Sequence, residues 1–230
     1  ASMIIKPPDS LQARLAAQRA TLPATDPASE ARLRGLHQHL RGLQHSANDL
    51  DAQLADGTRW ALLHDLHLRI DGRSLWIDHL LINRQLDILL LASPHYGDSL
   101  SVDEQGEFFR EVRGRRLGFA SPLNRLHRQL ALLRTWSRQL AWPYRQGGPL
   151  TPSWLFAVLL APHADSEAPA AFAELLVRPH QLNDWLAIHT RHPERSTLDT
   201  LAHSVSVDTL RGFAQQWCDK IGRASCRERV

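Results

Sequence analysis

The sequence WIDHLLI, at residues 76–82, lies at the centre of an ordered series of short blocks. HDL stands before it at 64–66, and LDILLLASPHY at 86–96, GEF at 106–108 and SPL at 121–123 follow it. The two longest blocks are mostly aliphatic, as is typical of buried strands. A Ser-Pro pair is typical of a helix start, because serine caps the first turn and proline fits the first helical position. The series therefore predicts adjacent strands followed by a helix.

The segment before these blocks has helical spacing. Leucines at 33, 36, 40 and 43 step by three and four residues and form one apolar stripe. Ser29 is the expected N-cap of this helix. A shorter helix begins near Ser10, and the break at 22–27 allows the two helices to form a hairpin.

From Trp60 onward the spacing changes to that of strands. Asp71-Gly72 predicts a tight turn within a β-hairpin. The expected strands lie at 60–68, 75–82, 86–92, 99–102, 107–112, 154–160 and 175–177, and the later helices begin at Ser121 or span 180–188 and 208–217. We therefore expect an α/β (α+β) fold, in which a mixed β-sheet is flanked by helices and preceded by the helical hairpin.

Length and composition fit an ordinary globular domain with an extension. The chain has 230 residues, and its hydrophobic content of 43% is sufficient for a packed core. No apolar run is long enough to cross a bilayer, and no secretory signal is visible, so we expect a cytoplasmic protein without a membrane partner. The two cysteines, Cys218 and Cys226, are eight residues apart, a spacing not typical of zinc sites.

We expect three parts along the chain: a helical N-terminal extension (1–56), the main domain (57–220) and a non-native tail (221–230). The last ten residues resemble the translation of a sequencing adapter, and Ala1-Ser2 before Met3 is typical of a cloning scar or an upstream read-through. A natural basic tail is the alternative interpretation of residues 221–230. We expect this tail to be exposed and to contribute nothing specific to the fold.

The ordered blocks resemble the NERD (nuclease-related) domain, a bacterial branch of the PD-(D/E)XK nuclease fold. That family typically has an Ile-Asp-His-Leu strand, a second strand that ends in Glu-x-Lys, and a Ser-Pro helix start followed by a glutamine. The resemblance covers roughly residues 60–140 and implies a restriction-endonuclease-like fold. Residues 77–80 match the first strand, whereas Ala92-Ser93-Pro94 stand in place of Glu-x-Lys.

The resemblance also implies a catalytic site that is incomplete here. Nucleases of this type hold a divalent cation with an Asp and a Glu and orient the attacking water with a Lys. Asp78 occupies the Asp position, but Ala92 and Pro94 offer neither a carboxylate nor a charge. The segment at 40–50 contains no glutamate, and Arg125 replaces the glutamine. Asp78 is either a vestige of catalysis or a structural residue that binds backbone donors.

Positive charge is concentrated in the segment that follows the GEF block and includes the SPL block. Residues 110–145 contain nine arginines and one glutamate, although the whole chain has a net charge of only +3. Arginine suits phosphate recognition because its planar group donates parallel hydrogen bonds. The candidate nucleic-acid-binding residues are Arg113, Arg115, Arg116, Arg125 and Arg128, and ordinary solubilising charge is the alternative.

The thirteen histidines suggest a further alternative, a zinc site. The closest pairs are His37 with His39 and His64 with His67, which we place on surface segments without a third ligand.

These observations favour a catalytically degenerate nuclease-related domain that binds DNA or RNA through its arginine-rich face, or serves an accessory role. Such a domain needs no cofactor. One alternative is an active nuclease with a rearranged site, which would require Mg²⁺. Another is a protein-interaction module that uses the N-terminal hairpin.

Overall fold

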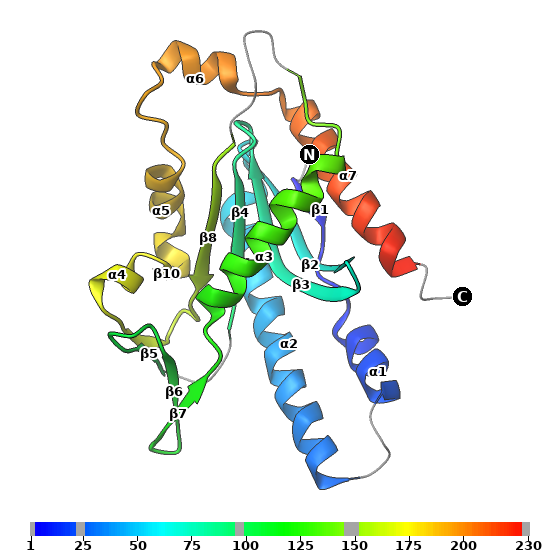
Figure 1. The fold of residues 1–230 in the computed structure, drawn as a ribbon, viewed down its shortest axis with the longest axis vertical. Helices are drawn as coiled ribbons and strands as arrows, with labels where there is room; N and C mark the ends of the chain where they lie inside the picture. Colours follow the sequence, from blue (N-terminus) through cyan, green and yellow to red (C-terminus); the bar gives the residue numbers. More distant parts are fainter. Residues whose placement is uncertain (1–2, 22–25, 95–98, 145–151, 227–230) are drawn as a thin grey trace.

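The computed structural model describes residues 3–21, 26–94, 99–144 and 152–226, which form two mixed sheets and seven α-helices (Figure 1). The strands are β1 (Ile4–Lys6), β2 (Trp60–Ile70), β3 (Arg73–Asn83), β4 (Ile88–Ala92), β5 (Ser99–Val102), β6 (Phe108–Val112), β7 (Arg115–Phe119), β8 (Trp154–Leu159), β9 (Asp165–Glu167) and β10 (Leu176–Val177). The helices are α1 (Leu11–Thr21), α2 (Pro27–Leu54), α3 (Pro122–Trp136), α4 (Ala170–Ala173), α5 (Leu182–His189), α6 (Thr197–His203) and α7 (Val207–Cys226), with short 3-10 turns η1 (Ser137–Gln139) and η2 (Pro179–Gln181).

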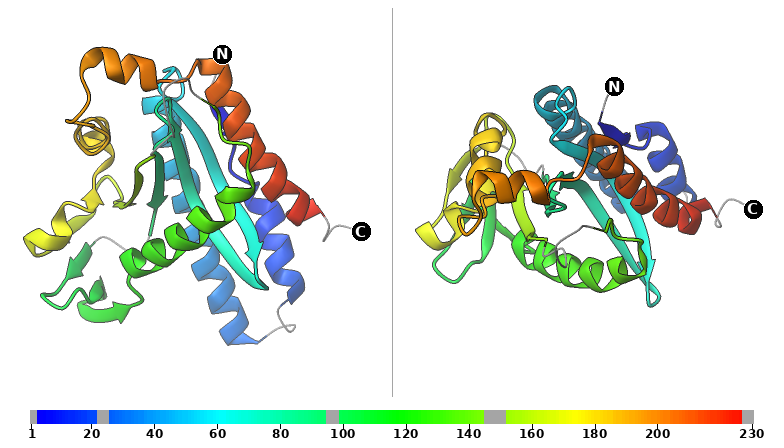
Figure 2. Two further views of the ribbon diagram at one scale, coloured as in Figure 1. Left: turned by 45° about the horizontal axis from the view of Figure 1, so that its top comes forward. Right: turned by 90° about the horizontal axis from the view of Figure 1, so that it is seen from above.

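The main sheet has six strands in the order β1-β2-β3-β4-β8-β10. The strands β2, β3 and β4 are antiparallel to their neighbours in this group, whereas β8 runs parallel to β4. Helices α3 and α7 lie on one face, and α2 and α5 lie on the other (Figures 1 and 2). Because both faces are covered, all five residues of β4 are buried. The expected mixed α/β architecture with helices on both sides of a sheet is confirmed.

Two apolar clusters hold these layers together. The α3–α7 cluster contains Leu126 and Leu133 of α3 with Phe213 and Trp217 of α7. The α2–α5 cluster packs Leu50 of α2 and helix α5 against the opposite face. Burial of these apolar side chains stabilises the sandwich of helices and sheet.

The hairpin of β2 and β3 has a regular turn and an irregular middle. Asp71 and Gly72 both have positive φ, 49° and 76°, as in the type I′ turn that their sequence predicted. Asp65 also has a positive φ of 56°, and the regular pairing passes from His64–His79 directly to Leu66–Ile77. This interruption changes which side chains face each layer.

The alternation of side chains between the two faces is broken at the interruption, although the strand register is unchanged. In a regular strand successive side chains point to opposite faces, so residues three apart do not share a face. Here Leu63 and Leu66 belong to the same α3–α7 cluster, as do Ile77 and Leu80. Two residues in each strand, not one, are therefore excluded from that cluster. They are His64 and Asp65 of β2 and Asp78 and His79 of β3.

The second sheet is small and has the order β7-β6-β5-β9. Arg113 and Gly114, with φ of 50° and 72°, connect β6 to β7 and bring Val112 opposite Arg115. Leu100 and Phe108 anchor this sheet to the α3–α7 cluster.

The N-terminal extension differs from the expected helical hairpin in two respects. Strand β1 within it joins the main sheet beside β2, and Met3 is fully buried. The N-cap of α2 is Asp26, whose carboxylate accepts a hydrogen bond from the Ala28 N–H, and not Ser29. Pro27 at the first helical position shifts the start upstream, because proline suits that position and Asp caps well.

The expectation that residues 221–230 are exposed is wrong for Ile221. Helix α7 continues to Cys226, and Ile221 is 3% exposed within the α3–α7 cluster. The apolar stripe that ends at Trp217 extends by one further turn, since residues four apart share a helix face. Residues 227–230 and the side chains of 222–226, Cys226 included, lie outside the described part of the chain. Among the described helices, none is long and apolar enough to span a membrane.

We predict that Ile221→Ala lowers the free energy of unfolding by roughly 2–5 kcal/mol, because it leaves a cavity in a packed core. The matched control is Ile188→Ala on α5, since Ile188 is 59% exposed and its truncation removes little buried surface. Urea denaturation of both variants measures the difference. Equal stability of the two variants would contradict the packing of α7.

Candidate nucleic-acid interface

Asp78 lies in the middle of β3, beside the C-terminal end of β4. Its Oδ2 accepts a hydrogen bond of 2.9 Å from the backbone N–H of Ser93. Extending the register from the His79–Leu91 pair by one residue puts Asp78 opposite Ala92. The Asp position and one replaced position, Ala92, therefore lie on adjacent strands, although Ala92 packs within the α3–α7 cluster and Asp78 does not. This hydrogen bond agrees with the interpretation of Asp78 as a structural residue that binds a backbone donor.

Helix α3 brings an arginine to the same place. Nη2 of Arg125 is 3.8 Å from Oδ2 of Asp78, and the Arg125 side chain is 42% exposed. Ser121 caps this helix by accepting from the Asn124 N–H, as its sequence predicted. Gln129, one turn further along, donates to the carbonyl oxygen of Trp76 at 2.7 Å and fixes this flank of α3 against β3.

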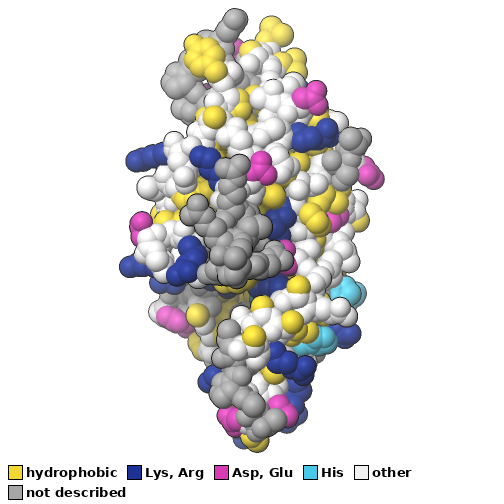
Figure 3. All heavy atoms as spheres, turned by 90° about the vertical axis from the view of Figure 1, so that its right-hand side faces the viewer, with side chains coloured by type: hydrophobic (Ala, Val, Ile, Leu, Met, Phe, Trp, Pro, Cys, Tyr) yellow, Lys and Arg dark blue, Asp and Glu magenta, His cyan; other side chains and the backbone are white. Residues whose placement is uncertain are grey.

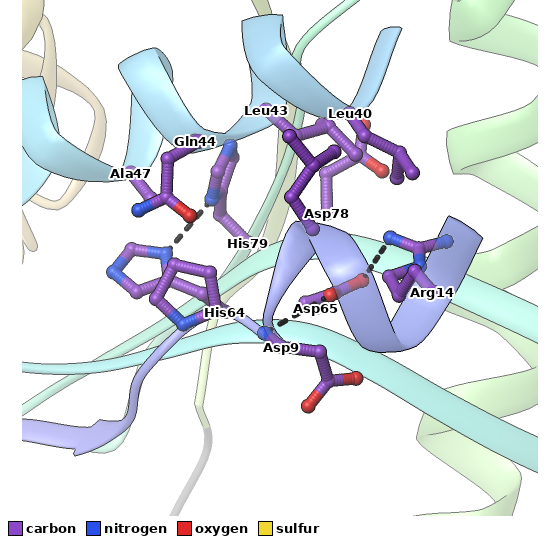
Figure 4. A pocket seen from close by; sticks show the side chains of 12 residues that line it. Asp9, Arg14, Leu40, Leu43, Gln44, Ala47, His64, Asp65, Asp78 and His79 are labelled. Atoms are coloured by element: carbon purple, nitrogen blue, oxygen red, sulfur yellow. Dashed lines mark hydrogen bonds and ion pairs between the residues drawn. The ribbon is translucent and has the colours of Figure 1, made fainter. Parts of the chain in front are cut away.

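A second carboxylate lies beside Asp78 (Figure 4). The carboxylate of Asp65 accepts a hydrogen bond of 2.5 Å from Nη1 of Arg14 and one of 3.2 Å from the backbone N–H of Asp9. Burial raises the pKa of Asp65, and the Arg14 guanidinium opposes that increase. The HDL block contains this residue, but its spacing alone did not indicate that it would face Asp78.

Asp65 and Asp78 line a small hollow between α1, α2 and the β2–β3 hairpin (Figure 4). Its volume is about 20 Å³, which is room for about one water molecule. Leu40, Leu43 and Ala47 of α2 form its apolar wall. In the described part of the chain, no group of three His, Cys, Asp or Glu is arranged to hold a metal ion.

His39 of α2 is electrostatically linked to both carboxylates. Burial lowers the pKa of His39, Asp78 raises it, and Arg125 and Arg14 lower it further. The site therefore disfavours a positive charge at His39 even though two carboxylates are near. Its two guanidinium groups already neutralise those carboxylates.

A chain of buried hydrogen bonds crosses the sheet behind Asp78. Nε2 of His64 is 2.7 Å from Oδ1 of Asp51 on α2. Nδ1 of His64 is 2.9 Å from Nδ1 of His79, and Nε2 of His79 is 2.8 Å from Oγ of Ser93. The side chains of His64, His79 and Ser93 are at most 1% exposed. The expectation that His64 lies on a surface segment is therefore wrong, since β2 is central in the sheet.

The carboxylate of Asp51 determines which atoms donate and which accept along this series of hydrogen bonds. An ionised carboxylate only accepts, so His64 donates to it from Nε2, and with a neutral imidazole its Nδ1 accepts. His79 must then donate from Nδ1, which leaves its Nε2 to accept from the Ser93 hydroxyl. One pair of neutral tautomers satisfies every ring nitrogen, and α2 is tied through β2 and β3 to the end of β4.

The remaining candidate arginines lie on the β6–β7 hairpin and further along α3. Arg128 is exposed and one turn beyond Arg125, so these two are neighbours on the helix surface. Arg115 and Arg116 are consecutive residues of β7 and point to opposite faces of the small sheet. Arg113 is in the turn between β6 and β7. The five arginines therefore do not share one face.

Other sides of the molecule carry a mixed charge. On the side that α1 and α7 occupy, Lys and Arg side chains are scattered among polar and apolar groups (Figure 3). Arg14 on α1 lies 4.4 Å above the ring of Trp76, whose other face stacks on His67 at 3.9 Å. This arginine is already engaged by Trp76 and Asp65, which leaves the α3 arginines as the more accessible group.

No family model, curated protein or solved structure matches this chain. The residues at Asp78 and on α3 must therefore be interpreted from their own geometry.

We predict that Ser93→Ala lowers the free energy of unfolding by roughly 1–3 kcal/mol, because it leaves Nε2 of His79 buried without a donor. The backbone bond from residue 93 to Asp78 is retained in this variant. Ser101→Ala, at a half-buried position of β5, is the control, and its effect should be below about 0.5 kcal/mol. If both substitutions have the same small effect on the urea midpoint, the hydrogen-bond chain does not stabilise the fold.

We predict that His39→Gln makes stability less sensitive to acid. The pKa of His39 is lower in the folded than in the unfolded state, so its contribution is present above pH 6.5 and decreases as pH falls through the unfolded value. Urea midpoints at pH 7.5 and 5.0 should therefore differ less for this variant than for the wild type. His45→Gln, an exposed substitution on the same helix, should retain the wild-type difference. An unchanged difference in His39→Gln would contradict the electrostatic description of the site.

Proposed function

We propose that this chain is a catalytically degenerate, nuclease-like domain with a restriction-endonuclease-like fold, and that it binds DNA or RNA through helix α3 beside Asp78. Three of the sequence blocks converge there. Asp78 is on β3, Ala92 ends the neighbouring β4, and Ser121 starts the helix that brings Arg125 to Asp78. This convergence supports the NERD-like interpretation.

The composition of the exposed surface of α3 carries the proposal. Helix α3 and the following η1 contain Arg125, Arg128, Arg134 and Arg138 and no acidic residue. Arg128, Arg134 and Arg138 are exposed and Arg125 is half-exposed. Exposed arginines with no acidic neighbour on the same helix attract phosphates and release counterions when they bind them.

The neighbourhood of Arg125 favours binding over hydrolysis. Oδ2 of Asp78 is engaged by Ser93, and Asp65 is engaged by Arg14 and Asp9. Ala92 and Pro94 add no oxygen ligand, and Mg²⁺ requires several oxygens in octahedral geometry. The carboxylates serve here to orient guanidinium groups.

One observation favours the second candidate, a metal-dependent nuclease with a rearranged site. Asp65 supplies a second carboxylate beside Asp78 that was not expected from the sequence. For a cation to bind Asp65, the Arg14 side chain would have to leave its carboxylate.

We predict that Arg125→Gln/Arg128→Gln weakens binding of a fluorescein-labelled DNA or RNA duplex about tenfold or more at low salt. The slope of log affinity against log salt should fall by roughly two units, since each lost phosphate contact reduces it by about one. Fluorescence anisotropy between 50 and 200 mM NaCl measures both quantities.

The matched control for this experiment is Arg32→Gln/Arg34→Gln on α2, which removes two exposed charges far from Asp78 in sequence. Its binding should change by less than about threefold. Equal losses in both double variants would indicate general electrostatic attraction. No binding by the wild type at low salt would reject the proposed function.

We predict that the purified chain does not cleave plasmid, linear or single-stranded nucleic acid with Mg²⁺ or Mn²⁺, because the site lacks a second free carboxylate and a lysine. Agarose electrophoresis after prolonged incubation measures this. Cleavage that is lost in Asp78→Ala would establish the nuclease alternative instead.

A further inference from the structure

A second surface lies on the small sheet and includes no residue of helix α3. The strands β5, β6, β7 and β9 border an open groove of about 900 Å³. Ser99 pairs with Asp165, Ser101 with Glu167, and Glu111 with Arg116, so each pair lies on one side of the sheet. This groove, here called the acidic groove, is within the size range of ligand-binding clefts.

The strand at the border of the groove has an unpaired edge. In the order β7-β6-β5-β9, β9 pairs with β5 alone among the described strands. All three of its residues, Asp165, Ser166 and Glu167, are exposed. Backbone N–H and C=O groups on such an edge can pair with an added strand.

The charges of the groove select the kind of strand that fits. Its lining carries five carboxylates, of Asp103, Glu104, Glu111, Asp165 and Glu167, and two guanidinium groups, of Arg110 and Arg116, for a net charge of −3. The guanidinium group of Arg116 lies 3.8 Å above the ring of Phe109 on the neighbouring strand. This contact holds the Arg116 side chain close to the surface of the sheet. A phosphate backbone is repelled by this lining, whereas a basic chain is attracted.

The geometry points to the occupant: we propose that the acidic groove binds an extended, lysine- or arginine-rich segment of a partner protein, which pairs with β9. Asp165 and Glu167 are two residues apart and point to the same side of their strand. Alternate side chains of an added strand have the same period, about 6.7 Å, so two basic residues can meet the two carboxylates in register. The surface is separate from α3, and this proposal does not depend on nucleic-acid binding.

The experiment uses the full chain and a fluorescein-labelled octapeptide of four Lys-Thr repeats, in which lysines alternate. We expect binding, measured by fluorescence anisotropy in 150 mM NaCl, and no binding of the matching Glu-Thr peptide. Amide hydrogen exchange should slow at residues 165–167 when the Lys-Thr peptide is present.

Two charge-reversed variants distinguish a specific groove from general attraction. Asp165→Lys/Glu167→Lys should weaken peptide binding at least tenfold. The control Glu30→Lys/Asp184→Lys, which reverses two exposed carboxylates on α2 and α5, should weaken it less than twofold. If Asp165→Lys/Glu167→Lys does not fold by circular dichroism, Asp165→Asn/Glu167→Gln replaces it, with the same direction expected.

Three results would overturn the proposal. These are no peptide binding by the wild type, equal losses in the groove and control variants, or hydrogen-exchange protection confined to segments other than β9. Preferential binding of a labelled DNA duplex that is lost in the groove variant would assign the groove to nucleic acid instead. Failure of the α3 variants to affect DNA binding leaves this result unchanged, because the two surfaces share no residue.

Discussion

The left-handed backbone of Asp65 is the constraint on which the polar site depends. A positive φ is costly for a non-glycine residue and persists only where the surrounding structure compensates. Here the compensation includes the Arg14 and Asp9 bonds to its carboxylate. The interruption excludes two residues in each of β2 and β3 from the α3–α7 cluster. Without it, strict alternation would direct Asp78 into that apolar cluster, together with Leu80.

The buried histidine and serine side chains behind Asp78 are stable because they are hydrogen-bonded to one another. Asp51, His64, His79 and Ser93 form one directional chain from α2 across the sheet. Breaking one link leaves a buried polar group unpaired, which costs more than a surface hydrogen bond contributes. The same hydrogen bonds tie α2 to β3 and β4 beside the small hollow. A site closed in this way is better suited to positioning Arg125 than to admitting a hydrated cation.

Local sequence signals predicted the parts of the fold that depend on local chemistry. The Asp71-Gly72 turn, the Ser121 cap and the aliphatic strand β4 were all indicated by neighbouring residues. The Asp65 interruption was not, because aspartate tolerates positive φ but seldom requires it. Pairing of His64 with His79 depends on strand register, and burial of Ile221 depends on the path of α7 over the sheet. The cap at Asp26 was missed because Ser29, three residues later, is also of a residue type that caps helices well.

Paramagnetic broadening by Mn²⁺ tests most directly whether the carboxylates beside Asp78 are satisfied by the chain itself. Amide spectra of the full chain are recorded during titration with Mn²⁺, for the wild type and for Asp78→Asn. We predict no selective broadening at residues 76–80 or at Ser93, because Arg14, Arg125 and backbone donors engage Asp65 and Asp78. Selective broadening there that disappears in Asp78→Asn would show a working cation site and contradict this account.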